Sequence, residues 1–109
     1  MIVKLSAREE QYPDLSPEQA YVVIGIEADD FRLLNDQGRP YLYSHERFEI
    51  IDRRQPDDWI TEISEDGERY AYPPALSKVG FFEDFFEAQQ QAVATFWHVV
   101  NQHLALAMA

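Results

Sequence analysis

The chain contains no cysteine, which excludes a disulfide framework, a thiolate nucleophile and a cysteine-ligated zinc site. It has only four glycines, and they form neither a Gly-x-Gly-x-x-Gly nor a Walker pattern, so no phosphate-binding loop is predicted. Positive charge is also scarce, with 9 Lys and Arg against 20 Asp and Glu. The resulting net charge of −11 repels phosphate, and we expect no direct binding of nucleic acid or of anionic membranes.

Long apolar runs are missing too. The first ten residues, MIVKLSAREE, do not have the apolar segment of a secretory signal. Residues 88–109 carry no Lys, Arg, Asp or Glu, but glutamines, an asparagine and two histidines interrupt their apolar stretches, which are too short to span a bilayer. We therefore expect a cytoplasmic protein.

What the chain does contain is enough apolar material for one folded unit. Of its 109 residues, 46% are hydrophobic and 14% are aromatic, which favours a globule over a disordered chain. We expect a single domain over residues 1–109. It divides into a β-rich core at 1–52, a second hairpin at 53–79 and a helical segment at 80–109.

Period-two and β-branched patterns predict seven strands. They cover residues 2–5, 21–28, 31–34, 40–43, 48–51, 59–63 and 69–72. Gly25 inside the second run indicates a bulge or bend, and Asn35-Asp36-Gln37-Gly38 is a turn between two strands. Residues 44–47 form a short break that we expect to be 3₁₀.

From Gly80 onward the apolar spacing changes to three and four residues. This predicts an amphipathic helix, or two helices broken near Glu87 to Gln90. Helical spacing places most of Phe81, Phe82, Phe85 and Phe86 in the core, and leaves one or two of them for a partner. The fold class that we expect is α+β: a small SH3-like antiparallel barrel or sheet, extended by the second hairpin, with the helical segment packed on it.

Several pieces of the chain resemble a type of small acidic bacterial domain. A strand motif comprises Leu15, Pro17, Tyr21, Val23, Gly25 and Ile26. A hairpin motif comprises Asn35, Asp36, Gly38 and Pro40, and a closing strand comprises Phe48, Glu49 and Ile50. Glu18 stands where that pattern has glycine. The later stretches DGERYAYPPAL and GFFEDFFE are also similar. The resemblance covers Leu15 to Glu87. Proteins of this type are small and SH3-like, and some of them are similar to immunity proteins, which are encoded beside toxins of polymorphic or secreted toxin systems.

Residue types suited to catalysis are few and poorly placed. His98 and His103 are five apart and do not share a helix face, and we expect both on the polar flank of the terminal helix. His45 begins a His-Glu pair without the second histidine of a zinc signature, so no metal site is predicted. The pairs Asp29–Asp30 and Asp57–Asp58 suit turns better than acid–base work. We expect no catalytic residue and no cofactor.

Aromatic and acidic residues instead suggest a binding surface. Tyrosine and tryptophan supply large contact areas with a polar tip, and carboxylates attract a basic partner. The predicted partner-binding residues are Asp29, Asp30, Tyr41, Tyr43, Asp57, Asp58, Trp59, Tyr70 and Tyr72. The alternatives are that these aromatics fill the core and that the acidity only maintains solubility.

Two functions are open at this point. The resemblance implies a non-catalytic inhibitor that occludes a cognate toxin, with a basic toxin domain as its protein partner. The alternative is a generic SH3-like module that binds peptides or forms homodimers through Phe96, Trp97 and Val100 of the terminal helix.

Overall fold

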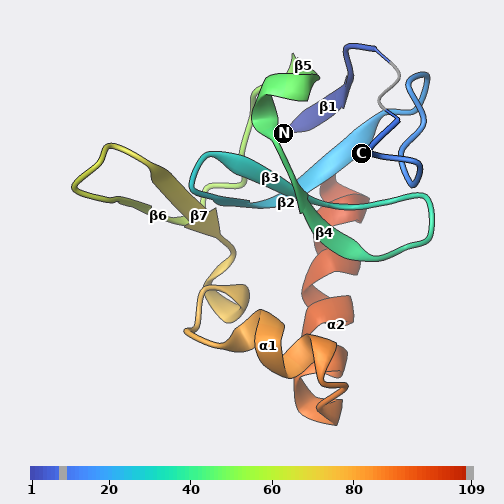
Figure 1. The fold of residues 1–109 in the computed structure, drawn as a ribbon. Coiled ribbons are helices and arrows are strands. Elements are labelled where there is room, and N and C mark those ends of the chain that lie inside the picture. Colours follow the sequence, from blue (N-terminus) through green and yellow to red (C-terminus); the bar gives the residue numbers. More distant parts are fainter. Residues whose placement is uncertain (8–9, 108–109) are drawn as a thin grey trace.

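The computed structural model describes residues 1–7 and 10–107, which form an α+β fold with an antiparallel sheet beside two α-helices (Figure 1). The strands within these residues are β1 (Ile2–Leu5), β2 (Tyr21–Glu27), β3 (Asp30–Leu34), β4 (Pro40–Tyr43), β5 (Phe48–Asp52), β6 (Ile60–Ile63) and β7 (Arg69–Tyr72). The helices are η1 (His45–Arg47), η2 (Pro74–Leu76), α1 (Phe81–Phe86) and α2 (Gln90–Ala107). The expected α+β class, the seven strands and the 3₁₀ turn are confirmed.

The helical segment is broken where the sequence pattern weakens. Ala88, between α1 and α2, has a φ of 60°, which an α-helix cannot continue through. The alternative with two helices is therefore confirmed. No helix in the described residues is both long and apolar enough to cross a membrane.

The sheet does not close into a barrel, so of the two expected arrangements, a barrel or a sheet, the structure has the open sheet. Its main path runs β4-β3-β2-β1-β5, and no pairing within residues 1–7 and 10–107 joins β4 to β5. Aromatic side chains occupy the opening instead. The ring of Tyr43 lies 5.3 Å from that of Tyr12 and 6.5 Å from that of Phe48, so packing takes the place of a hydrogen-bonded ladder.

A bulge in β2 lets one strand serve two cores. The register with β3 shifts between Val23 and Gly25, which confirms the predicted irregularity at this glycine. Because of the shift, Val23 and Ile26 both reach the first core, although their spacing in a regular strand would place them on opposite faces. Ile24 faces the second core.

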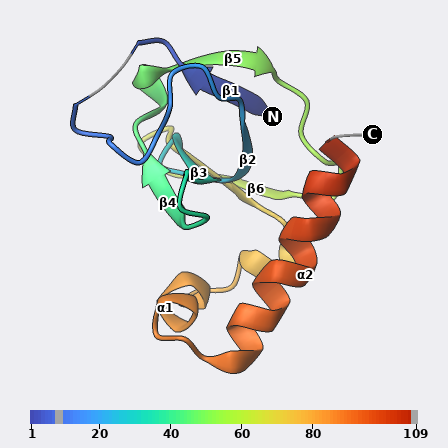
Figure 2. The same cartoon turned by 90° about the vertical axis from the view of Figure 1, so that its right-hand side faces the viewer.

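The second core lies between the sheet and the helices. Phe96 and Val100 of α2 are almost fully buried there, together with Leu76 of η2 and Phe81 of α1. Figure 2 shows α2 running along one side of the molecule with α1 packed against its N-terminal half. The helical stripe predicted from the sequence therefore packs on the sheet, as expected.

The turn of the β3–β4 hairpin anchors the loop that precedes β2. The Asn35 side chain accepts hydrogen bonds from the amides of Gln37 and Arg39 and donates one to Asp14. The Tyr43 hydroxyl donates to the same carboxylate at 2.7 Å. Burial and this carboxylate raise the pKa of Tyr43, so the phenol stays neutral. The turn thus has a structural role within the domain.

His103 lies in the interior, so its expected place on the polar flank of the helix is wrong. Its Nε2 is 3.1 Å from the carbonyl oxygen of Val23, and its ring is stacked 5.5 Å from that of Trp59. A histidine here ties the last turns of α2 to β2. Burial lowers the pKa of His103, which the Val23 carbonyl and Asp58 only partly oppose.

The β2–β3 turn is made by Ala28 and Asp29, one residue earlier than expected, with φ values of 54° and 69°. Two consecutive left-handed residues are typical of a type I′ turn, which favours Asn and Gly. Alanine pays a steric penalty there because its Cβ crowds the following carbonyl.

We predict that Ala28→Asn stabilises the fold by about 0.5–1 kcal/mol, because asparagine tolerates the left-handed conformation better. Urea unfolding followed by tryptophan fluorescence measures the change. Ala20→Asn is the control, because Ala20 is exposed and lies outside the positive-φ positions. Equal effects of both substitutions would contradict the turn assignment.

We also predict that His103 makes stability pH-dependent. Its pKa lies below the ordinary 6.5 in the folded state, so the unfolded chain binds more protons between the two values. Stability is therefore lost as the pH falls from about 6.5 through the lower folded pKa. His103→Gln should reduce the loss between pH 7 and pH 5 in urea unfolding. The exposed His98→Gln control should leave it unchanged.

Candidate functional site

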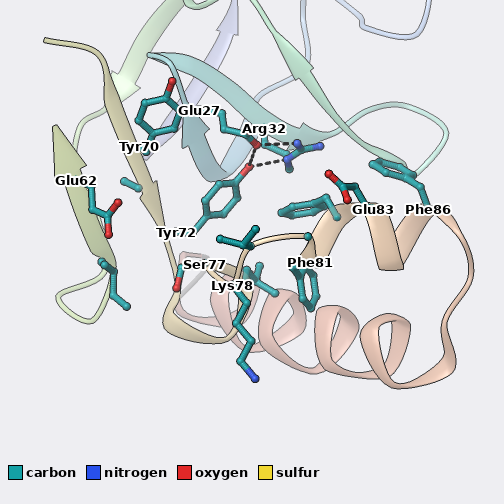
Figure 3. Close-up of a pocket in the computed structure, with 16 residues that line it drawn as sticks. Glu27, Arg32, Glu62, Tyr70, Tyr72, Ser77, Lys78, Phe81, Glu83 and Phe86 are labelled. Atoms are coloured by element: carbon teal, nitrogen blue, oxygen red, sulfur yellow. Dashed lines mark hydrogen bonds and ion pairs between the residues drawn. The ribbon is translucent and has the colours of Figure 1, made fainter. Parts of the chain in front are cut away.

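A groove opens between the β6–β7 hairpin and α1, with a volume of about 590 Å³. It is called the hairpin groove here, and its walls include Ile60, Glu62, Tyr70, Tyr72, Phe82 and Glu83. Figure 3 shows Glu62 on the hairpin side and Glu83 on the α1 side, with Tyr72, Glu27 and Arg32 between them. Figure 1 shows the hairpin projecting from the body of the sheet. The groove therefore lies where the three predicted segments meet.

Three polar side chains form the floor of the groove. The Arg32 guanidinium donates from Nε to the Tyr72 hydroxyl at 2.7 Å and from a terminal nitrogen to Glu27 at 2.9 Å. The Tyr72 hydroxyl donates to the same Glu27 oxygen at 2.7 Å. The other terminal nitrogen of Arg32 donates to the Pro40 carbonyl at 2.7 Å, so all its nitrogens have partners.

Local sequence explains why an arginine is buried here. Arg32 alternates with Phe31 and Leu33, which face the first core, so its side chain emerges on the opposite face of β3. That face meets α1, where the guanidinium carbon lies 3.9 Å from the centre of the Phe82 ring. A cation–π contact of this kind helps to offset the loss of hydration.

Gly25 supplies the space for Tyr72. A Cβ at position 25 would lie 2.0 Å from Cε1 of the Tyr72 ring, closer than any real contact. The ring therefore lies directly over the backbone of β2, beside the bulge. Gly25 is required at this position because of the close approach, and any side chain there would displace Tyr72 and its hydrogen bonds.

The floor carries one negative and one positive charge around a neutral phenol. Burial alone would raise the pKa of Glu27, but the hydrogen bonds from Tyr72 and Arg32 outweigh it and lower the pKa. Burial raises the pKa of Tyr72, and Glu27 adds to this effect while Arg32 opposes it. Neither pKa is shifted towards neutral pH, where a general acid or base works best. The geometry suits holding the groove in shape rather than transferring protons.

The walls of the groove are apolar and acidic. All four residues of β6 are exposed; Ile60, at 44%, lines the groove, whereas Ile63, at 64%, lies on the opposite face of the strand. Between Asp57 and Tyr72 the sequence has six carboxylates and a single arginine. Lys78 also borders the groove, but its ammonium group points away from Glu62 and Glu83 (Figure 3). A clustered apolar patch with such a rim is typical of an interaction surface.

The structure separates the predicted tyrosine pairs. Tyr41 is 40% exposed with its ring 5.8 Å from that of Phe86, whereas Tyr43 is buried in the first core. Tyr70 lies exposed at the groove, whereas Tyr72 is buried beneath it. One ring of each pair is thus available at the surface. Tyr43 and Tyr72 are interior because their hydroxyls are engaged by Asp14 and by Arg32 with Glu27.

The predicted acids lie in three places. Asp29 accepts a hydrogen bond from the Arg69 amide at 3.3 Å, and Asp30 lies 3.3 Å from a ring nitrogen of His45. Asp57 and Asp58 are exposed just before β6, whereas Trp59 is buried against His103. Asp57 and Asp58 therefore precede β6 without lining the groove, Asp29 belongs to the β2–β3 turn and Asp30 begins β3. Partner binding by these residues remains a prediction.

Sequence reasoning missed the buried Arg32 and its partner Glu27. A lone charge within the apolar run FRLL was the available signal, because a charge in a half-buried strand requires a partner. The exposed isoleucines of β6 were also missed. Among the four phenylalanines at 81–86, Phe86 is the exposed one at 47%, which agrees with the expectation that one or two face outward.

Residues that could hold a metal do not gather. Across residues 1–7 and 10–107, no three His, Asp or Glu side chains come together in a way that could hold an ion. The Glu27 carboxylate is already engaged by Arg32 and Tyr72.

The chain matches no family model, and searches of curated proteins and of solved structures found no match either.

We predict that Tyr72→Phe lowers the free energy of unfolding by about 1–3 kcal/mol, because the buried Arg32 and Glu27 each lose a hydrogen-bond partner. Chemical denaturation measures the change. Tyr70→Phe is the matched control, since its hydroxyl is exposed and makes a 3.3 Å contact with Glu68. A loss of similar size in both variants would show that the floor network is not what Tyr72 stabilises.

Proposed function

We propose that the protein is a non-catalytic, immunity-type inhibitor that neutralises a bacterial toxin by covering its functional surface. The observation that supports this most is the projecting β6–β7 hairpin, whose Ile60 and Tyr70 are exposed at the hairpin groove and whose Ile63 is exposed on the opposite face. Exposed apolar and aromatic side chains at a groove supply binding energy. A surface of this kind needs no reacting group to act.

The acidity of the chain supports a basic partner. A net charge of −11 attracts a positively charged surface and orients it during approach. If the toxin binds nucleic acid, its basic cleft would accept the carboxylates of the hairpin in place of phosphate. Burial of apolar side chains would then provide the slow dissociation that inhibition requires.

We further propose that residues 1–52 are SH3-like. The order of strand, loop, long strand, hairpin, 3₁₀ turn and strand supports this interpretation. The open gap between β4 and β5 is a departure from a closed barrel. A fold hosts many functions, so this likeness bears on the scaffold and not on the partner.

The second candidate function is a peptide-binding or homodimerising module. Trp97 and Leu106 of α2 are 36% and 72% exposed, which favours a helix-mediated contact. Phe96 and Val100, which we expected at such a contact, are buried in the second core and cannot also face a partner copy. The apolar surface left on α2 is therefore smaller than the sequence suggested.

We predict that co-expression of this protein rescues growth of cells that produce the toxin encoded by the neighbouring reading frame. The purified pair should form a 1:1 complex by size-exclusion chromatography with light scattering. Its association rate should fall as NaCl is raised, because charge steers the encounter. A toxin that stays lethal and forms no complex would refute the inhibitor function.

The self-association alternative gives a different outcome in the same experiment. A homodimer that is stable without any toxin and is broken by Trp97→Ser would favour the dimerising module. Trp97→Ser should leave the toxin complex intact if the hairpin is the contact surface.

A further inference from the structure

The outer edge of β6 is unpaired. In the described part of the chain β6 pairs only with β7, in the register Ile60 with Tyr72 through Ile63 with Arg69. An unpaired strand edge presents backbone donors and acceptors that a further strand can use. Natural sheets usually cover or distort such edges, whereas here the whole of β6 is exposed.

The register shows which residues direct their backbone groups outward. The Ser64 amide donates to the Glu68 carbonyl, and the Arg69 carbonyl accepts from the Asp29 amide on the opposite side of β7. The N–H and C=O groups of Arg69 therefore point away from β6. Those of its partner Ile63 must point away from β7, towards the free edge. By alternation, Thr61 and Ile63 offer their N–H and C=O groups to the free edge.

Side chains at this edge form two faces. Ile60 and Glu62 border the hairpin groove, whereas Thr61 and Ile63 project from the other face. A strand added beside β6 would place every second side chain over the groove, next to Glu62 and opposite Glu83. The remaining side chains of the added strand would lie on the face opposite the groove and cover Ile63, which is 64% exposed.

Charge selects the occupant. A second copy of this chain would bring Glu62 and the Glu65–Glu68 turn of each hairpin towards the same carboxylates of the other, and like charges across a strand pair are unfavourable. A segment with lysine or arginine at alternate positions would instead pair its cations with Glu62 and Glu83. The aliphatic stems of those side chains suit Ile60 and Tyr70.

We propose that β6 takes up an extended, basic segment of the partner protein as an additional strand, with its alternate Lys or Arg side chains in the hairpin groove. This deepens the proposed function and rests on it for the identity of the partner. Backbone hydrogen bonds at Thr61 and Ile63 give the affinity, and the groove gives the preference for basic side chains.

The test uses a ten-residue peptide that alternates lysine and threonine, together with a peptide that alternates glutamate and threonine. Titration of the ¹⁵N-labelled protein measures Kd, and hydrogen exchange measures amide protection. The lysine peptide should bind and should protect the Thr61 and Ile63 amides. The glutamate peptide should bind at least about tenfold more weakly.

Two pairs of variants separate the backbone contribution from the charge contribution. Ile63→Pro removes an outward backbone N–H and leaves the β6–β7 ladder intact. It should weaken binding of the lysine peptide at least about tenfold, well beyond the effect of Ile63→Ala. Glu62→Gln should weaken it about fivefold, whereas Glu49→Gln on β5 should not. Circular dichroism and the fluorescence of the buried Trp59 report whether each variant is folded.

The proposal is overturned if the lysine peptide does not bind. It is also overturned if NMR chemical-shift changes spread over the surface while the Thr61 and Ile63 amides gain no protection from hydrogen exchange. Pairing of β6 with a second copy of the chain would overturn it as well. If the neighbouring toxin is neutralised equally well by Ile63→Pro, the inhibitor function stands and the strand-addition mode fails. If the peptide docks on β6 while the toxin stays lethal, the docking site stands and the inhibitor function fails.

Discussion

The buried guanidinium of Arg32 is the constraint on which the rest of the structure depends. It joins β3 to the end of β2 through Glu27, to β7 through Tyr72, to β4 through the Pro40 carbonyl and to α1 through the Phe82 ring. A buried charge is costly unless its donors are all satisfied, so these elements must keep their relative positions. The same contacts hold the hairpin apart from α1 and so define the hairpin groove.

Gly25 and the bulge beside it make this arrangement sterically feasible. The bulge sends Val23 and Ile26 into the first core while Ile24 reaches the second. The missing side chain at position 25 admits the Tyr72 ring to the backbone of β2. One strand thus organises two cores and the floor of the groove.

A rigid floor beneath a flexible partner segment is a sound basis for tight binding. The side chains of the floor, Arg32, Tyr72 and Glu27, are already held by hydrogen bonds in the free protein, so they lose little entropy when a partner arrives. Glu62 and Glu83 are on the rim, where the proposed function has them steer association, and Ile60 and Ile63 are on the strand that the proposed partner segment would cover. Inhibition by occlusion, as proposed, would need only such shape and charge.

Local sequence patterns were enough to predict the strands, most of the turns and the break between α1 and α2. These features depend on local patterns, such as the alternation in residues 40–43, the Asn-Asp-Gln-Gly turn and the three- and four-residue spacing after Gly80. Sequence reasoning also found the aromatic and acidic character of the chain, including the exposed Tyr70 at the groove and the exposed Asp57–Asp58 pair before β6.

Which tyrosine of each pair is buried depends on contacts between segments that are distant in the chain. Tyr43 and Tyr72 are interior because residues far away in the chain, Asp14 for one and Arg32 with Glu27 for the other, satisfy their hydroxyls. Trp59 and His103 are buried against each other through a contact between their rings, although they are 44 positions apart in the chain. Local periodicity carries no information about such distant partners, so the buried network and the free edge of β6 became visible only in the folded chain.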